Sequence, residues 1–414
     1  MITCSSALSS VVPLHAMKGI LEQASILLAI LVSVVSAQTT EDRIRKHGYP
    51  AERHTIQTSD GYILTMFRIP HPRNYNERNS STRPVAFLQH GLLSSSDCWI
   101  LNGPGLALAY MLVESGYDVW LGNSRGNTYS KRHAAYSPFF QLFWNFDWHE
   151  IALFDMPAMI DYVLYTTGEE SLHYVGHSQG TTVLFVMTSL TPSFNYKIKS
   201  AQLLAPVAFM NNIRGPFVEL ATPFLGLPNG LVELFGSLEF LPNNLIVRTL
   251  GDQMCRDDSI TQPICSNVIF LICGWRNNSF NKTLLADIIH THPAGASVNQ
   301  VMHFLQEHIS GHFRQFDYGF LRNLMVYGKL TPPEYNLKKV KVPTFLYYGD
   351  NDYLSHPIDV QRLMRRLPNV QYSYRVPDPN WNHLDHLWAN NVKEIIFDRL
   401  LNNVNIMESL AREG

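Results

Sequence analysis

The chain has little charge, few cysteines and no long apolar run in its interior. Its 414 residues are 16% charged and carry a formal net charge of −2. This balance gives no excess of basic residues that would favour binding to nucleic acid. No internal run is apolar and long enough to cross a membrane. We therefore expect an ordinary globular monomer with a large core, no nucleic-acid partner and no transmembrane segment in the mature chain.

Motifs for metals and cofactors are also missing. The sequence has no H-E-x-x-H, no paired cysteine spacing typical of zinc and no phosphate-binding G-x-x-x-x-G-K-[ST] loop, so we expect no metal and no cofactor. The cysteines are Cys4, Cys98, Cys255, Cys265 and Cys273. Cys255 and Cys265 flank a polar turn that could close as a short disulfide loop, but cysteine arithmetic alone does not settle the pairing.

The N-terminus differs from the rest of the chain. Ser25–Ala37 is apolar and ends in small residues, which predicts a leader over residues 1–37 and cleavage before Gln38. The alternative is an N-terminal membrane anchor, for which the run is short. Translation could start at Met1 or Met17. A secretory route fits the N-x-[ST] sequons, which predict glycosylation at Asn79, Asn277 and Asn281.

Apolar strands alternate with helix patterns along the chain. We predict strands at Pro84–Gln89, Tyr117–Leu121, Leu172–Val175, Ser200–Leu204, Val342–Tyr348 and Val370–Val376, and a hairpin within His54–Arg68. Predicted helices are Glu41–His47, Leu106–Ser115, Phe154–Tyr165, Thr181–Leu190 and Asp385–Leu401. The alternation predicts an α/β protein with a mainly parallel, doubly wound sheet flanked by helices.

The alternation stops after Ala205 and resumes near Lys341. We therefore divide the mature chain into a core of residues 38–206 and 337–414 and an inserted, mostly helical segment of residues 207–336. Phe209–Leu250 holds only five charged residues, and its Pro and Gly spacing allows only short helices. A separate folded module and a cap over the functional edge of the sheet are both possible, and the apolar composition favours the cap.

The stretch that organises the chain is Gly176–Gly180, which reads G-x-S-x-G between a predicted strand and a predicted helix. A sharp turn of this kind exposes the hydroxyl of Ser178 at a helix N-terminus, where developing negative charge is favoured. The alternative is an ordinary glycine-bounded turn with an inert serine.

A nucleophilic serine needs a histidine base and a carboxylate that orients it, and in this fold they follow the serine in the order acid, then histidine. Asp352 or Asp350 could supply the carboxylate, and His383 or its neighbour His386 the imidazole. Backbone N–H groups of Gln179 and of Leu92, in the turn after Pro84–Gln89, are the expected oxyanion donors, unless that turn is merely structural. Arg125 is expected to be a structural hydrogen-bond donor.

These motifs together resemble the acid lipase family, which includes gastric and lysosomal acid lipases. The resemblance rests on FLQHGLLSSS (Phe87–Ser96), GYDVWLGNSRGN (Gly116–Asn127), LHYVGHSQGTT (Leu172–Thr182), HPAGASV (His292–Val298), NDYLSHPIDV (Asn351–Val360) and NHLDHLW (Asn382–Trp388). It implies an α/β-hydrolase fold with a catalytic triad of Ser178, Asp352 and His383 and oxyanion donors at Leu92 and Gln179. It also implies a Cys255–Cys265 disulfide, with Cys273 left as a thiol.

The resemblance implies a secreted or lysosomal serine lipase that acts on triacylglycerols or sterol esters at a lipid-droplet or emulsion interface. A catalytically weak lipid carrier and a short-chain esterase are the alternatives. We further hypothesise that Phe209–Cys273 contains a lid that opens at a lipid surface, because the segment is apolar and broken by Pro and Gly; a rigid helical cap is the alternative.

Overall fold

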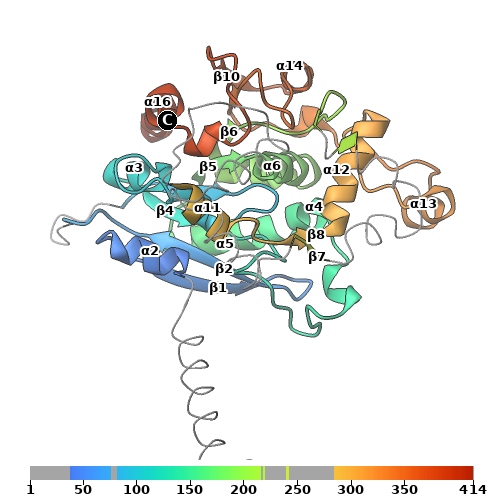
Figure 1. Ribbon diagram of the computed structural model, residues 1–414, viewed down its shortest axis with the longest axis horizontal. Helices are drawn as coiled ribbons and strands as arrows, with labels where there is room; N and C mark the ends of the chain where they lie inside the picture. Colours follow the sequence, from blue (N-terminus) through green and yellow to red (C-terminus); the bar gives the residue numbers. More distant parts are fainter. Residues whose placement is uncertain (1–37, 76–81, 216–217, 220–238, 242–283, 414) are drawn as a thin grey trace, which may run out of the picture.

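The computed structural model describes residues 38–75, 82–215, 218–219, 239–241 and 284–413 (Figure 1). The strands are β1 (Glu52–Gln57), β2 (Ile63–Ile69), β3 (Val85–Gln89), β4 (Asp118–Leu121), β5 (Leu172–His177), β6 (Ile198–Leu204), β7 (Glu239–Phe240), β8 (Ala296–Ser297), β9 (Thr344–Tyr348) and β10 (Val370–Arg375).

The α-helices are α2 (Thr40–Lys46), α3 (Leu108–Glu114), α4 (Trp148–Glu150), α5 (Met156–Thr167), α6 (Gln179–Leu190), α11 (Leu285–Thr291), α12 (Val298–Ser310), α13 (Phe320–Tyr327), α14 (Pro357–Met364), α15 (Asp385–Trp388) and α16 (Asp398–Glu413). Short 3-10 helices lie at η2 (Ser96–Trp99), η3 (Gln141–Trp144), η5 (Pro192–Lys197) and η8 (Leu337–Lys339). Turns of π-helix lie at η4 (Ile151–Asp155) and η9 (Lys393–Phe397).

An eight-stranded sheet organises the fold, in the order β1-β2-β4-β3-β5-β6-β9-β10. β1, β2 and β4 pair in antiparallel fashion, and every pairing from β4 to β10 is parallel. In Figure 1 the sheet runs from β1 at the bottom of the view to β10 at the top. This confirms the predicted mainly parallel α/β sheet. Because carboxyl ends of parallel strands meet at one edge, the loops after β3, β5, β9 and β10 share that edge.

The central strands of the sheet are buried on both faces, and β3 illustrates how. Val85 and Phe87 join one hydrophobic cluster with residues of α5 and α6, whereas Ala86 and Leu88 join a second cluster with residues of α3 and α16. Side chains of a strand alternate between faces, so a strand covered by helices on both sides must be apolar throughout. This is why β3 is apolar from Val85 to Leu88, with Gln89 as its last residue.

The predicted insertion lies between neighbouring strands. β6 and β9 pair directly, although the chain runs from Leu204 to Thr344 between them. The described part of that segment contains α11, α12 and α13. It also contains β7 and β8, a two-residue antiparallel ladder that was not predicted because it is too short to alternate. The domain boundaries at residues 207 and 336 stay predictions.

The C-terminal prediction is partly wrong. We expected one helix over Asp385–Leu401, but α15 ends at Trp388, and Ala389 takes an extended conformation. The chain then forms η9 and continues in α16 as far as Glu413. Asn390 and Asn391 follow the break, and asparagine competes with helical hydrogen bonding through its own side chain.

Cys98 is a buried free thiol, and burial raises its pKa well above the usual range. Several other predicted features lie outside the described residues. They are the leader 1–37, most of the lid segment Phe209–Cys273, the cysteines Cys255, Cys265 and Cys273, and the sequons at Asn79, Asn277 and Asn281.

Candidate active site

The turn between β5 and α6 carries Ser178. Ser178 has φ 54° and ψ −121°, in the left-handed half of backbone space that side chains other than glycine rarely occupy. Its N–H donates to Leu204 O at 3.0 Å, on the neighbouring strand β6. A Cβ at Gly180 would collide with Gln89 O, so only glycine lets α6 approach β3 this closely. The turn is therefore strained and tightly held, as the motif predicts.

His383 and Asp352 form a buried pair. His383 Nδ1 lies 2.9 Å from both Asp352 Oδ1 and Oδ2. The carboxylate only accepts hydrogen bonds, so Nδ1 carries a proton, and in the neutral form of the ring Nε2 is the nitrogen with the lone pair. The backbone N–H groups of Leu354 and Ser355 also donate to Asp352 Oδ1, at 2.9 and 2.7 Å. Burial would raise the pKa of Asp352, but His383, with smaller contributions from His386 and the Ser355 N–H, outweighs it and holds the pKa below its usual value.

The rival carboxylate has a different environment. Asp350 pairs with the exposed guanidinium of Arg375, with N···O distances of 2.6 and 2.7 Å. Of the two candidate carboxylates, Asp352 is the one that contacts His383.

His177 links the serine turn to the histidine loop. His177 Nε2 lies 3.1 Å from His383 O, and the two imidazole rings are 4.9 Å apart between centroids. Burial lowers the pKa of His177 far below its usual value, so the ring is neutral and donates from Nε2 to the carbonyl. Since His177 precedes Ser178, this bond fixes the serine turn against the loop of His383. The hydrogen-bond partner of His177 lies far along the chain, although His177 is adjacent to Ser178 in sequence.

His386, the rival histidine, is fully buried beside this loop. Its Nδ1 lies 3.1 Å from Asn382 O, and its Nε2 makes no hydrogen bond among the described residues. Burial lowers the pKa of His386 to about 4.

The buried His386 should make folding sensitive to acid. A pKa that is lower in the folded chain than in the unfolded chain means that unfolding takes up a proton below pH 6.5. The free energy of unfolding therefore falls as the pH drops from 6.5 toward 4, by about 3 kcal/mol for this group. We expect His386→Gln to make this dependence shallower by that amount in urea denaturation across the window. The surface change His312→Gln should leave it intact, and an unchanged slope in His386→Gln would refute the assignment.

The loop after β3 packs directly against the nucleophile turn. A Cβ at Gly91 would lie 2.9 Å from Ser178 Cβ, so this position requires glycine. His90 holds the loop from the other side: its Nδ1 donates to Gly91 O at 2.8 Å and its Nε2 accepts from Ser124 N at 3.1 Å. Burial lowers the pKa of His90 to about 4, which keeps the ring neutral for these two roles.

The two expected oxyanion donors flank this contact. Leu92 follows Gly91 on the loop, and Gln179 is the first residue of α6. The first N–H groups of an α-helix have no partner within the helix, so the N–H of Gln179 is available to a ligand. We did not predict from the sequence that His90 supports this loop. Its position directly after β3 could have indicated that role.

Arg125 is structural, as predicted. Its buried guanidinium donates to Asp155 at 2.7 Å and to Asp60 at 2.6 and 2.9 Å, and it stacks 3.9 Å from the Tyr62 ring centroid. It holds the loop after β4 against the β1–β2 hairpin and η4.

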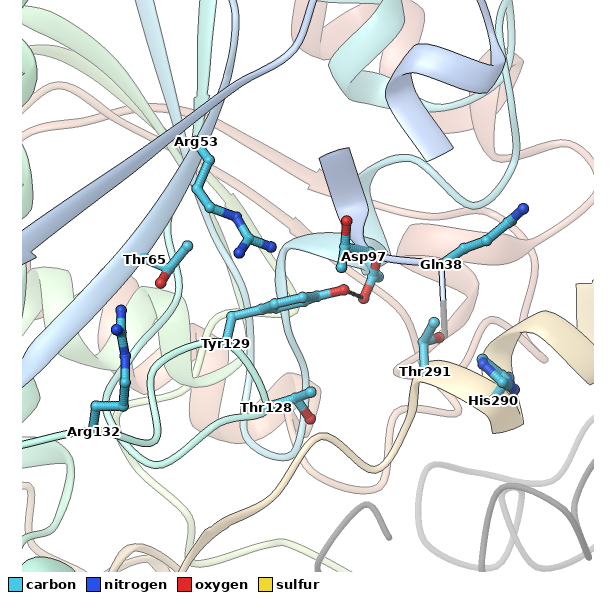
Figure 2. A pocket seen from close by; sticks show the side chains of 10 residues that line it. Gln38, Arg53, Thr65, Asp97, Thr128, Tyr129, Arg132, His290 and Thr291 are labelled. Atoms are coloured by element: carbon cyan, nitrogen blue, oxygen red, sulfur yellow. Dashed lines mark hydrogen bonds between the residues drawn. The ribbon is translucent and has the colours of Figure 1, made fainter. Parts of the chain in front are cut away.

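A polar pocket of about 360 Å³ lies apart from these residues (Figure 2). No member of the Ser178, Asp352 and His383 set lines it, and its lining is charged and polar, which does not suit an acyl chain. The lining residues are Gln38, Thr39, Arg53, Thr65, Asp97, Thr128, Tyr129, Arg132, His290 and Thr291. Figure 2 shows Tyr129 donating to Asp97, at 2.7 Å.

Two other features are absent from the part of the chain that the structure describes. No group of three or more His, Cys, Asp or Glu residues there could hold a metal ion. No helix among those residues has the length and apolar character needed to span a membrane.

Comparisons with known proteins identify the fold and the family. Residues 40–103 match the family described as the partial α/β-hydrolase lipase region, and residues 84–233 match the α/β-hydrolase fold. Lipase 3 of Drosophila melanogaster is 49% identical to the chain, over 89% of this chain and 93% of its own length. Gastric triacylglycerol lipase of Bos taurus is 43% identical, over 86% and 88%.

More distant proteins extend the comparison. Human lysosomal acid lipase/cholesteryl ester hydrolase is 38% identical, over 86% of this chain and 88% of its own. A solved structure of a soluble variant of monoglyceride lipase from Saccharomyces cerevisiae has a TM-score of 0.54, over 90% of this chain and 97% of that one. At 14% identity it supports the fold alone. The fold, the motifs and these identities lead to one conclusion: the chain belongs to the family of gastric and lysosomal acid lipases, which have the α/β-hydrolase fold.

Proposed function

We propose that this protein is a serine lipase that hydrolyses carboxylic esters of neutral lipids, with Ser178, His383 and Asp352 as its catalytic triad. The observation that carries the proposal is the buried His383–Asp352 pair, 2.9 Å between Nδ1 and the carboxylate, fixed by His177 to the turn of Ser178. A serine hydroxyl is a weak nucleophile unless a histidine in a fixed tautomer takes its proton.

The reaction proceeds in two acyl transfers. His383 Nε2 takes the proton of Ser178 as Oγ attacks the ester carbonyl, and Asp352 stabilises the imidazolium that forms. Backbone N–H groups of Leu92 and Gln179 stabilise the oxyanion. The tetrahedral intermediate collapses to an acyl-enzyme as His383 protonates the departing alcohol. Water, deprotonated by the same histidine, then attacks the acyl-enzyme and releases the fatty acid and the free serine.

The alternatives have weaker support. A lipid carrier would not need a buried carboxylate that orients a histidine beside a strained serine. A short-chain esterase would not need the apolar surface described next. Gastric and lysosomal relatives support the proposal of a secreted or lysosomal protein, in which the leader, the three sequons and the Cys255–Cys265 disulfide would have their usual roles.

An exposed apolar helix supports a lipid interface as the partner. α13 projects at the right-hand end of the view in Figure 1, and Asn323 is its buried residue. The side chains of Leu321 and Met325 are 73% and 78% exposed, and Phe320, Leu324 and Val326 are exposed as well. A contiguous apolar patch is costly in water and marks an interaction surface in soluble proteins. At an oil–water interface these side chains would leave water.

We expect the double change Leu321→Asp/Met325→Asp to weaken adsorption to triolein emulsions by about tenfold or more, because each buried Leu or Met side chain contributes about 1.5–3 kcal/mol. Turnover of a dissolved short-chain ester should stay near the wild-type value. The matched control is Ile406→Asp/Leu410→Asp, two exposed apolar residues with the same spacing on α16. Equal loss of adsorption in both variants would rule out α13 as the docking surface.

The proposed activity is tested with triolein, cholesteryl oleate and a short-chain ester, each at acid and at neutral pH. The proposal expects Ser178-dependent hydrolysis of at least one long-chain lipid ester. Activity on the short-chain ester alone would indicate an esterase. Lipid binding without hydrolysis would indicate a carrier.

A further inference from the structure

One segment of the inserted region contacts both loops of the expected oxyanion hole. We name residues 292–300 the bridging segment; it comprises the chain before β8, β8 itself and the first turn of α12. At one end, Ala294 N donates to Leu93 O at 2.7 Å. Leu93 follows Leu92 directly and has φ 60°, a conformation that needs support from its surroundings.

At the other end, the bridging segment reaches the residue after the nucleophile. Gln179 Nε2 donates to Gln300 Oε1 at 2.8 Å, and both side chains are buried. Gln300 is itself held at the start of α12, where its N–H donates to Ser297 Oγ. Ser297 Oγ in turn donates to Phe146 O at 2.5 Å, which anchors the bridging segment to the core.

We propose that Gln300 is a positioning residue for the hydrolysis, and that the bridging segment fixes the two oxyanion donors relative to each other. Gln300 holds Gln179, whose backbone N–H is one donor, and Ala294 holds the loop that presents the other donor at Leu92. The inserted region thereby completes the active site of the core. This inference rests on the proposed function and adds to it a residue that the triad and its oxyanion donors do not include.

The chemistry explains why such a support matters. Oxyanion donors stabilise the transition state because they are aligned before the negative charge develops. The size of this stabilisation therefore depends on where the N–H groups lie. Gln179 is the first residue of α6, and its N–H is not fixed by helical hydrogen bonding. A second, independent anchor on its side chain limits that freedom. Displacement of a donor N–H by a fraction of an ångström lowers kcat, while substrate binding elsewhere in the site is unaffected.

The test is Gln300→Leu, which removes the acceptor while keeping a side chain of similar size. With a dissolved p-nitrophenyl ester we expect kcat to fall about 10-fold to 100-fold, below the about 10²–10³-fold expected for losing a donor outright. KM should change less than about twofold, because the ground-state carbonyl gains little from the oxyanion donors. Binding of an alkyl boronic acid, whose adduct with serine is tetrahedral, should weaken by about the same factor as kcat/KM.

Two further variants separate positioning from stability. Gln300→Glu keeps an acceptor oxygen at the same chain length and should recover most of the turnover. Gln306→Leu is the control on the same helix, because the side chain of Gln306 also makes hydrogen bonds, two of them with the Asp317 backbone at 2.8 Å each. It should lower the melting temperature to a similar extent while leaving kcat and boronate affinity near the wild-type values.

Wild type and Ser178→Ala are measured in the same assays. If wild type hydrolyses the ester, Ser178→Ala does not, and Gln300→Leu keeps its kcat and boronate affinity, the positioning role is refuted while the proposed function stands. Equal losses in Gln300→Leu and Gln306→Leu would also refute it, since both would reflect loosening of α12. A wild-type chain without Ser178-dependent hydrolysis would overturn both proposals.

Discussion

Replacing Ser178 by alanine should lower ester hydrolysis by about 10⁴-fold to 10⁶-fold, since triad members act as a unit and their loss leaves only binding and oxyanion stabilisation. The side chain is small and only 9% exposed, and its backbone N–H remains bonded to Leu204 O. The variant should therefore stay folded, with a melting temperature close to that of the wild type. Turnover is measured on emulsified triolein and on a dissolved ester.

Ser178→Gly gives a sharper control. Ser178 has φ 54°, which glycine tolerates without strain and alanine does not. The Ser178→Gly protein should therefore be as inactive as the Ser178→Ala protein. Its free energy of unfolding, measured with denaturant, should be higher by about 1 kcal/mol. A folded Ser178→Ala protein with turnover near the wild-type value would show that Ser178 is not the nucleophile.

The second large effect is expected at Asp352. Asp352→Asn should lower kcat by about 10⁴-fold, because an amide can hold the imidazole in the wrong tautomer. The fold should survive, since the asparagine oxygen can still accept the N–H groups of Leu354 and Ser355. Turnover and unfolding are followed on the same preparation.

Asp350→Asn is the matched control for this change. Asp350 lies two positions away and pairs only with the exposed Arg375 among the described contacts. An exposed ion pair contributes little, about 0–1 kcal/mol, so turnover should stay within a few-fold of the wild type. The reverse ranking of the two variants would mean that the wrong carboxylate has been assigned.

Much of the fold could be predicted because its signals are local. β3 and β5 are buried along their whole length and are therefore mostly apolar in sequence, with His173 as a buried polar exception in β5. The hairpin of β1 and β2 follows from alternation around the Asp60–Gly61 turn. The serine turn could be predicted because G-x-S-x-G combines a nucleophile with a glycine at a close strand–helix approach. The acid and histidine followed from chain order and from the resemblance to acid lipases.

The remaining features depend on contacts between distant segments, which leave no local pattern. Nothing near His177 in the sequence indicates that it bonds to the carbonyl of His383, and nothing near Gln300 indicates that it bonds to Gln179. The break after Trp388 was missed for another reason. Helical periodicity continues across it, and the asparagines that disfavour a helix there act through weak local competition.

The most direct test of the central claim is covalent trapping of the nucleophile. The protein is treated with a long-chain alkyl phosphonate ester, triolein hydrolysis is followed in parallel, and the modified peptide is identified by mass spectrometry. We predict one phosphonyl group on Ser178, formed in proportion to the loss of hydrolysis, and no labelling of Ser178→Ala. Complete loss of hydrolysis with the label on another residue, or full hydrolysis by a protein labelled at Ser178, would contradict the account.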